Sequence, residues 1–158
     1  MAEIKSINEL LNMDIDIPDY QRSYKWSIQN VEELLGDISN AINDAHIYRV
    51  AFKYRIGTII LHENDEGIFD VVDGQQRIIS LLLIKQCITP GFQCSVFEKE
   101  FTNKVTQTNI HNNYMFIREW LSLKNEEDKK NFIRAFDEIL EVVVISVDKV
   151  SEAFQLFD

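Results

Sequence analysis

The segment from Asp73 to Arg77 carries the side chains best suited to chemistry, because it joins a predicted strand to a predicted helix. The first N–H groups of a helix lack partners within the helix and lie at the positive end of its dipole, which favours a bound anion. Gly74 would let a phosphate approach the backbone closely, and Arg77 offers a planar fork for two phosphate oxygens. The amides of Gln75 and Gln76 add hydrogen-bond donors and acceptors. The segment therefore predicts a phosphate-binding turn.

Asp73 complicates a simple phosphate site, since a carboxylate on its own repels phosphate. Its presence fits a role in holding Mg²⁺ or in orienting a water molecule. The spacing Asp73-x-x-Gln76 also fits a helix capping box, so a purely structural role is an equal alternative. The segment lacks the Gly-x4-Gly-Lys pattern of a Walker loop.

A second polar and aromatic segment runs from Tyr20 to Trp26, between a predicted strand and a predicted helix. Aromatic rings can stack on a base, and Arg22 or Lys25 can bind phosphate. Alternatively, Tyr24 or Trp26 packs on the helix that follows, as a hydrophobic staple. We expect Trp26 to be mainly structural and Arg22 mainly functional. The two segments are expected to form opposite sides of one nucleotide pocket.

The charge balance limits the partners that the protein can bind. The 158 residues include 16 Lys and Arg against 26 Asp and Glu, a formal net charge of −10. Nucleic-acid binding draws much of its affinity from neutralised phosphates, so this balance disfavours a general DNA-binding protein. One stretch, Ala45 to Leu61, has no acid and contains Arg49, Lys53 and Arg55. It is either a solvated loop and strand edge or one side of an anion site.

Other chemistry finds little support in the sequence. Cys87 and Cys94 lack a CxxC partner and the three histidines have no metal-ligand spacing, so we expect no zinc site. Neither cysteine has a histidine nearby in sequence to activate it as a nucleophile. The N-terminus lacks the pattern of a signal peptide, and no apolar run approaches the ~20 residues of a membrane span. We therefore expect a cytoplasmic protein with free thiols and no membrane partner.

Hydrophobic periodicity and turn residues predict a single α+β domain over residues 1–158, with a small mixed sheet flanked by helices. The predicted helices are 7–12, 28–45, 75–88, one that opens at His111 and runs to Leu121, one from Asn125 to Leu140, and 152–158. The predicted strands are 13–17, 54–62, 68–72 and 142–147. The stretch from Cys94 to Thr108 is ambiguous and expected to be exposed. The last helix stops without a cap, which suggests an N-terminal fragment of a longer protein.

Three motifs, in this order, closely resemble the N-terminal domain of GmrSD-type modification-dependent restriction proteins. They are Ile17-Pro18-Asp19-Tyr20-Gln21-Arg22-Ser23-Tyr24-Lys25-Trp26, then Gly57-Thr58-Ile59-Ile60-Leu61, then Val72-Asp73-Gly74-Gln75-Gln76-Arg77. The Asn113-Tyr114 helix and the segment from Glu152 to Phe157 also resemble the family pattern. The resemblance therefore spans nearly the whole chain.

The resemblance implies a fold similar to the ParB/sulfiredoxin fold, in which a polar turn at a helix start binds nucleotide phosphates. It further implies a regulatory domain that binds a nucleoside triphosphate with Mg²⁺, hydrolyses it, and couples this to recognition of modified phage DNA. Cleavage of DNA would belong to a C-terminal HNH nuclease domain joined through a helical region, so we expect no nuclease activity from residues 1–158 alone.

The resemblance and the residue chemistry together assign the site. The expected catalytic residues are Asp73, Gln75, Gln76 and Arg77, the expected nucleotide-binding residues are Tyr20, Gln21, Arg22, Lys25 and Gly74, and the expected metal ligand is Asp73. The family usually continues Leu-Thr-Thr-Leu after the arginine, whereas this chain has Ile78-Ile79-Ser80-Leu81. The hydroxyl missing at Ile79 predicts weak hydrolysis if that group touches metal or phosphate.

Two other functions are carried as alternatives. The first is a DNA-binding or sensing module without catalysis, in which Lys53 or Arg55 contacts the DNA backbone. The second is a toxin–antitoxin or abortive-infection component that acts through a protein partner. The charge of −10 counts against the first.

Overall fold

The computed structural model describes residues 1–17, 23–48, 53–93, 101 and 103–147, with the backbone alone described for 43–48. The strands are β1 (Ala2–Ser6), β2 (Ile15–Asp16), β3 (Tyr54–Glu63), β4 (Phe69–Asp73) and β5 (Leu140–Val147). The helices are α1 (Ile7–Leu11), α2 (Ile28–Tyr48), α3 (Gln75–Ile88), α5 (Lys104–Ser122), α6 (Glu126–Arg134) and a π-helical turn, η1 (Ala135–Ile139). This mixed α+β architecture, with helices flanking a small mixed sheet, confirms the predicted fold class.

The sheet has five strands in the order β1-β5-β3-β4-β2. β3 and β4 form an antiparallel hairpin, and β4 pairs on its other side with β2 in parallel. β5 pairs in parallel with β3 and antiparallel with β1. Because β4 lies between β3 and β2, its last residue, Asp73, is held opposite Ile60 in the middle of β3.

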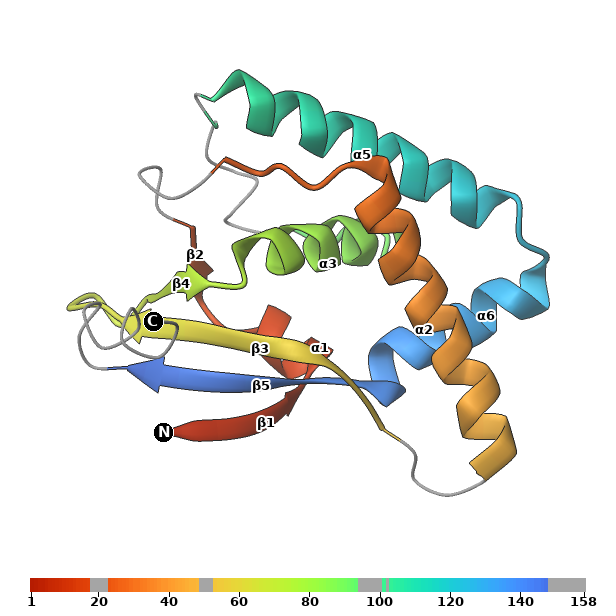
Figure 1. Cartoon of the computed structure of the whole chain (residues 1–158), viewed down its shortest axis with the longest axis horizontal. Coiled ribbons are helices and arrows are strands. Elements are labelled where there is room, and N and C mark those ends of the chain that lie inside the picture. The colour runs from red at the N-terminus through yellow and green to blue at the C-terminus, as the bar shows by residue number, and fades with distance from the viewer. Residues whose placement is uncertain (18–22, 49–52, 94–100, 102, 148–158) are drawn as a thin grey trace.

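Helix α3 leaves the end of β4 and lies between the sheet and α5 (Figure 1). Ile78, Leu81 and Ser80 on this helix have no exposed surface. A helix with neighbours on several sides must be apolar on several faces, which explains why its sequence shows no single apolar stripe. The predicted buried helix is confirmed with its predicted bounds.

Reciprocal hydrogen bonds fix the starts of two helices. The Glu9 N–H donates to Ser6 Oγ and the Ser6 N–H donates to Glu9 Oε1, each at 3.1 Å, which is a full capping box. The Ser27 N–H donates to Asn30 Oδ1 at 2.9 Å, and the Asn30 N–H donates to Ser27 Oγ at 3.4 Å. Each cap joins residues only three positions apart, so the local sequence is enough to specify it.

Several predicted boundaries are wrong, for β1 because its partner is distant in sequence and for α5 because a local cap was not recognised. β1 was not predicted, because it is a half-exposed edge strand whose order comes from pairing with β5. β2 covers two residues rather than the predicted 13–17. Helix α5 begins at Lys104, before the predicted start at His111, because the Asn103 side chain accepts the Thr106 N–H. Thr106 is buried rather than exposed.

The C-terminal part of the predicted helix 125–140 is also different. The α-helix ends at Arg134, a π-helical turn follows, and Leu140 opens β5. The predicted helix 152–158 lies outside the described residues.

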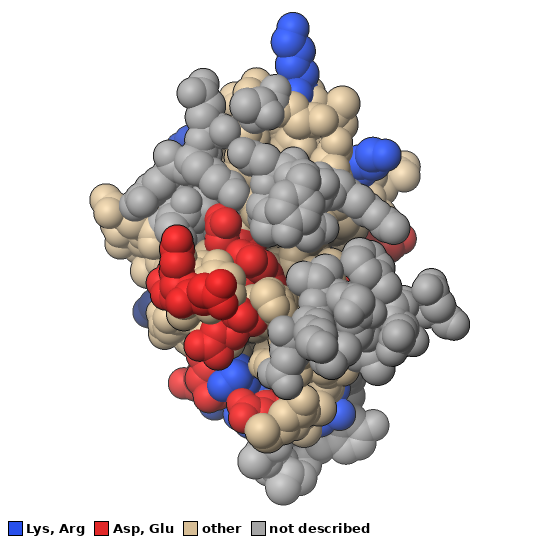
Figure 2. Space-filling view, turned by 90° about the vertical axis from the view of Figure 1, so that its left-hand side faces the viewer, with Lys and Arg blue, Asp and Glu red and all other residues tan. Residues whose placement is uncertain are grey.

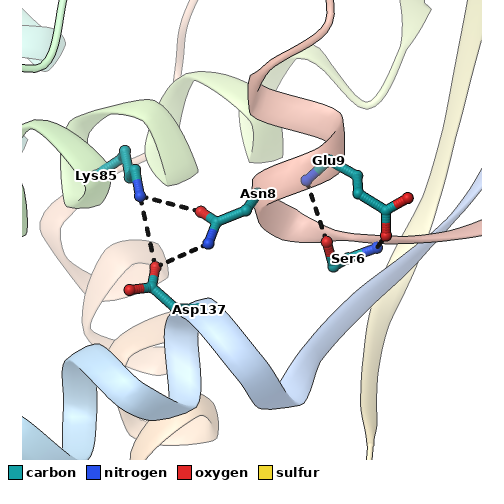
Figure 3. Close-up of polar contacts among 5 residues, drawn as sticks. All are labelled: Ser6, Asn8, Glu9, Lys85 and Asp137. Atoms are coloured by element: carbon teal, nitrogen blue, oxygen red, sulfur yellow. Dashed lines mark hydrogen bonds and ion pairs between the residues drawn. The ribbon is translucent and has the colours of Figure 1, made fainter.

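A polar triangle joins three elements on the opposite end of α3 from the polar turn (Figure 3). The Lys85 ammonium lies 3.0 Å from Asn8 Oδ1 and 3.4 Å from Asp137 Oδ1. The Asn8 amide closes the triangle by donating to Asp137 Oδ1 at 3.1 Å. Because the Lys85 side chain is only 15% exposed, its charge depends on these partners.

We predict that Asp137→Ala lowers the free energy of unfolding by about 1–3 kcal/mol. The substitution removes the anionic partner of the Lys85 ammonium and leaves the Asn8 amide without its acceptor. The neighbouring Glu138→Ala is the matched control, because its ion pair with Arg134 is largely exposed and such pairs contribute about 0–1 kcal/mol. Urea unfolding measures both variants. Equal losses for the two would show that the triangle carries no special stability.

A candidate phosphate-binding turn and its adjoining pocket

The polar turn brings a strand end directly onto a helix start. Gly74 is the N-cap of α3, with φ of +90°, and no side chain among the described residues caps the helix. The interpretation of Asp73 as a capping residue is therefore wrong, since the N-cap position belongs to Gly74. Asp73 ends β4 with its side chain exposed. The first turn of α3 thus presents backbone N–H groups that no side chain in the described part of the chain caps, which is the arrangement that favours an anion.

Packing explains why residue 74 is a glycine. A Cβ at this position would lie 2.5 Å from Ile59 Cδ1 and 3.3 Å from the Thr58 carbonyl oxygen. The positive φ also disfavours any residue with a side chain. Gly74 therefore allows the turn to lie against β3, which is a structural reason for glycine independent of any bound phosphate.

The two glutamines of the turn make hydrogen bonds within the protein. Gln75 is 6% exposed, and its amide donates to the Val71 carbonyl at 3.1 Å. The side-chain oxygen Oε1 of Gln76 accepts the Lys25 N–H at 2.7 Å, and its side-chain amide Nε2 donates to the Ser23 backbone carbonyl at 3.0 Å. Gln76 thereby ties the segment 23–26 to α3, which joins the two polar segments found in the sequence.

The buried side chain of Tyr24 anchors the segment 23–26. It is 1% exposed, and its hydroxyl lies 2.7 Å from Ser80 Oγ and accepts the Asn113 amide at 2.9 Å. The same Asn113 amide also donates to the Trp26 carbonyl at 2.9 Å. Burial raises the pKa of the Tyr24 phenol, and its hydrogen bonds with Ser80 and Asn113 partly oppose that shift. The phenol stays neutral and bonded on two sides.

Helix α5 completes the anchor through side chains that the sequence did not single out for this role. Thr106 Oγ1 accepts the Tyr24 N–H at 3.0 Å, and the Asn109 amide donates to the Tyr24 carbonyl at 2.8 Å. Asn113, expected to help open its helix, is instead a buried residue in the middle of α5. A signal exists, since polar residues 106, 109 and 113 recur at spacings of three and four on one helix face.

Arg77 is the third residue of α3, and its guanidinium lies against the backbone of β3. A Cβ on Gly57 would fall 2.4 Å from Arg77 Nη1 and 2.9 Å from its Cζ. The pairing of β3 with β5 shifts register between Arg55 and Thr58, so Gly57 lies in an irregular part of the strand. A glycine inside a strand often marks such a close approach. Gly57 was noted as a strand residue and as the start of a family motif, and the structure places the Arg77 guanidinium against it.

The Arg77 side chain lines a small pocket between α2, α3 and β3, with a volume of about 150 Å³. Trp26 and Tyr54 contribute aromatic rings to it, while Glu33 and Asp37 contribute carboxylates from one face of α2. The remaining lining residues are Asn30, Leu34 and Ile56. No hydrogen bond or ion pair joins Arg77 to another residue that the structure describes.

The residues of the turn are compatible with Mg²⁺ held together with phosphate. Among the described residues, no three His, Cys, Asp or Glu side chains gather into a metal-binding group. Magnesium usually takes one or two carboxylates and completes its shell with water and substrate phosphates. Asp73 can supply such a carboxylate beside the start of α3.

The structure describes only some of the other predicted site residues. Tyr20, Gln21 and Arg22 lie outside the described residues. Lys25 is exposed, and its backbone is held by Gln76. Trp26 is half-buried, with its ring on the pocket and its carbonyl bonded to Asn113.

The basic residues expected to form one side of an anion site make internal contacts where the structure describes them. The Arg55 guanidinium pairs with Glu141 at 3.1 Å, and the Lys53 ammonium donates to the Glu138 carbonyl. Arg49 lies outside the described residues. Figure 2 shows acidic side chains gathered on one face of the molecule. The described surface therefore gives no support to a DNA-backbone contact through Lys53 and Arg55.

Cys87 is the one described cysteine, and its thiol lies half-buried beside Arg118 on a second pocket. Burial raises the pKa of Cys87 to about 11, which Arg118 only partly opposes. A thiol with this pKa carries almost no thiolate at neutral pH, so the site offers no activated sulfur nucleophile.

The fold and the site define a small α+β domain with a polar, anion-favouring turn where a strand meets a buried helix. The family model of the GmrSD restriction endonuclease N-terminal domain matches residues 5–158, so the chain belongs to that family. Membership places the protein in a restriction system, with a role in defence against phage. A search of curated proteins found no match to the chain. Among the described residues, no helix is long and apolar enough to cross a membrane.

We predict that Tyr24→Phe lowers the free energy of unfolding by about 1–3 kcal/mol, because it leaves buried polar partners unsatisfied.

The raised pKa of the Tyr24 phenol also makes the stability depend on pH. The unfolded chain loses the phenol proton first, near pH 10, so this part of the stability falls as pH rises through that value. Urea unfolding from pH 8 to 11 measures both effects. Tyr114→Phe, at a half-buried ring near Arg118, is the control. Identical behaviour of the two variants would contradict the anchor.

We predict that Cys87 reacts with a maleimide at pH 7.5 roughly 100-fold more slowly than a free cysteine peptide, because its thiolate fraction is reduced by the raised pKa. A Cys94→Ser variant isolates this thiol, and the same variant in urea provides the fast reference. A rate close to that of the free peptide would contradict the shift.

Proposed function

We propose that the turn from Asp73 to Arg77 binds the phosphates of a nucleoside triphosphate, and that this domain regulates a modification-dependent restriction protein through that ligand. The observation that carries the proposal is the position of Arg77. Its guanidinium lies against Gly57 of β3, and Arg77 itself belongs to the first turn of α3, whose N–H groups no described side chain caps. A cation and a helix N-terminus that share one location favour an anion.

Each residue of the turn has a proposed part. The backbone N–H groups of the first turn of α3 and the Arg77 guanidinium bind phosphate oxygens, and Lys25 adds a second positive charge from the neighbouring segment. Gln75 and Gln76 act through position, because their amides hold β4 and the segment 23–26 in place around the turn. Tyr20, Gln21 and Arg22 are proposed to complete the nucleotide site from their side.

Asp73 is the proposed holder of Mg²⁺, which when bound with the triphosphate would neutralise phosphate charge. Phosphoryl transfer depends mainly on positioning and on charge stabilisation, and we propose that the same site hydrolyses the bound triphosphate. In the full protein, binding is proposed to be coupled to recognition of modified DNA, with cleavage by a C-terminal nuclease region.

The experiment is isothermal titration of the 158-residue chain with non-hydrolysable triphosphate analogues, with and without Mg²⁺. We predict that Arg77→Ala weakens binding by about 10- to 100-fold, which corresponds to loss of a charge-assisted hydrogen bond of about 1.5–3 kcal/mol. Asp73→Asn is expected to reduce the dependence of binding on Mg²⁺.

The matched control is Arg134→Ala, which removes a largely exposed arginine from α6, away from the turn. Thermal unfolding verifies that each variant stays folded. Unchanged affinity in a folded Arg77→Ala variant would refute the proposed role of the turn.

A further inference from the structure

We infer that the pocket beside Arg77 binds the ribose of the nucleotide and makes the site selective for ribonucleotides over deoxyribonucleotides. This inference rests on the proposed phosphate-binding function of the turn. It concerns the pocket lined by Arg77, Glu33, Asp37, Trp26 and Tyr54.

The first argument is the separation of opposite charges across the pocket. Glu33 and Asp37 are one helical turn apart on α2 and line the same pocket as Arg77 on α3, yet no ion pair joins Arg77 to either. Carboxylates and a guanidinium that line one pocket without meeting leave room for a group that contacts both sides. Such a group needs hydrogen-bond donors towards α2 and an acceptor or anion towards α3.

The second argument excludes simpler ligands. A free cation would be repelled by Arg77, and a free anion would be repelled by Glu33 and Asp37. The 2′- and 3′-hydroxyls of a ribose are donors to carboxylates, and the same sugar carries phosphate at its 5′ position. Pairing of acidic side chains with ribose hydroxyls is a well-established mode of nucleotide recognition.

The third argument comes from size and from continuity with the turn. A volume of about 150 Å³ is smaller than the ~300–1,000 Å³ of pockets that enclose whole ligands, so this pocket fits a part of the nucleotide. Arg77 belongs both to the pocket and to the first turn of α3, which places the sugar next to the proposed phosphate position. The half-buried rings of Trp26 and Tyr54 supply flat surfaces for the sugar and base.

The test compares the affinity of the 158-residue chain for ribonucleoside triphosphates with that for their 2′-deoxy and 3′-deoxy counterparts. We expect each deoxy analogue of the best-binding base to bind about tenfold more weakly. Asp37→Ala and Glu33→Ala should bring the ratio of ribo to deoxy affinity close to one, because they remove the carboxylates that accept from the sugar hydroxyls.

Glu32→Ala is the matched control, because Glu32 is an exposed acid on the same helix that does not line the pocket. It should preserve the ratio, whereas a general effect of negative charge would change it as much as Glu33→Ala does. Equal binding of ribo and deoxy forms, with binding still lost in Arg77→Ala, would overturn the ribose assignment and leave the phosphate site standing. No binding of any triphosphate would overturn both.

Discussion

The buried hydroxyl of Tyr24 is the constraint on which the site depends. A polar group without exposed surface must be hydrogen-bonded, since leaving it unsatisfied costs about 1–3 kcal/mol. Here Ser80 on α3 and Asn113 on α5 satisfy it together. The requirement fixes three separate parts of the chain at one point, because the segment 23–26, α3 and α5 each supply one member. With that point fixed, Gln76 reaches the backbone of the same segment, and the two polar segments lie side by side.

Two glycines set how closely the turn approaches the sheet. Gly74 lets the turn lie against Ile59, and Gly57 lets the Arg77 guanidinium lie against β3. Side chains at either position would push the helix start or the arginine away from the strand. A single arginine is thereby held at the junction of a helix N-terminus and a pocket with acidic and aromatic walls.

The elements that could be predicted are those governed by neighbours in sequence. The bounds of α3, the β3–β4 hairpin and the Ser6–Glu9 capping box depend on periodicity, turn residues and contacts a few positions apart. Prediction failed for β1 and for the start of α5. An edge strand such as β1 has a weak apolar pattern, and its order comes from hydrogen bonds to β5 at the other end of the chain. Thr106 is buried at the contact between α5 and the segment 23–26, where its hydroxyl accepts the Tyr24 N–H.

The sequence by itself determined the fold class, the family motifs and the presence of a polar turn at the start of a buried helix, because these follow from local spacing and composition. Tertiary structure decided what each polar side chain does. It placed Gln75 and Gln76 in internal hydrogen bonds, replaced Asp73 by Gly74 as the N-cap, and seated Arg77 on Gly57 opposite Glu33 and Asp37. The hydrogen bonds of Gln76, the approach of Arg77 to β3 and the pocket that it shares with α2 bring together residues far apart in sequence. Their geometry exists only once the sheet and helices pack together, so no local pattern encodes it.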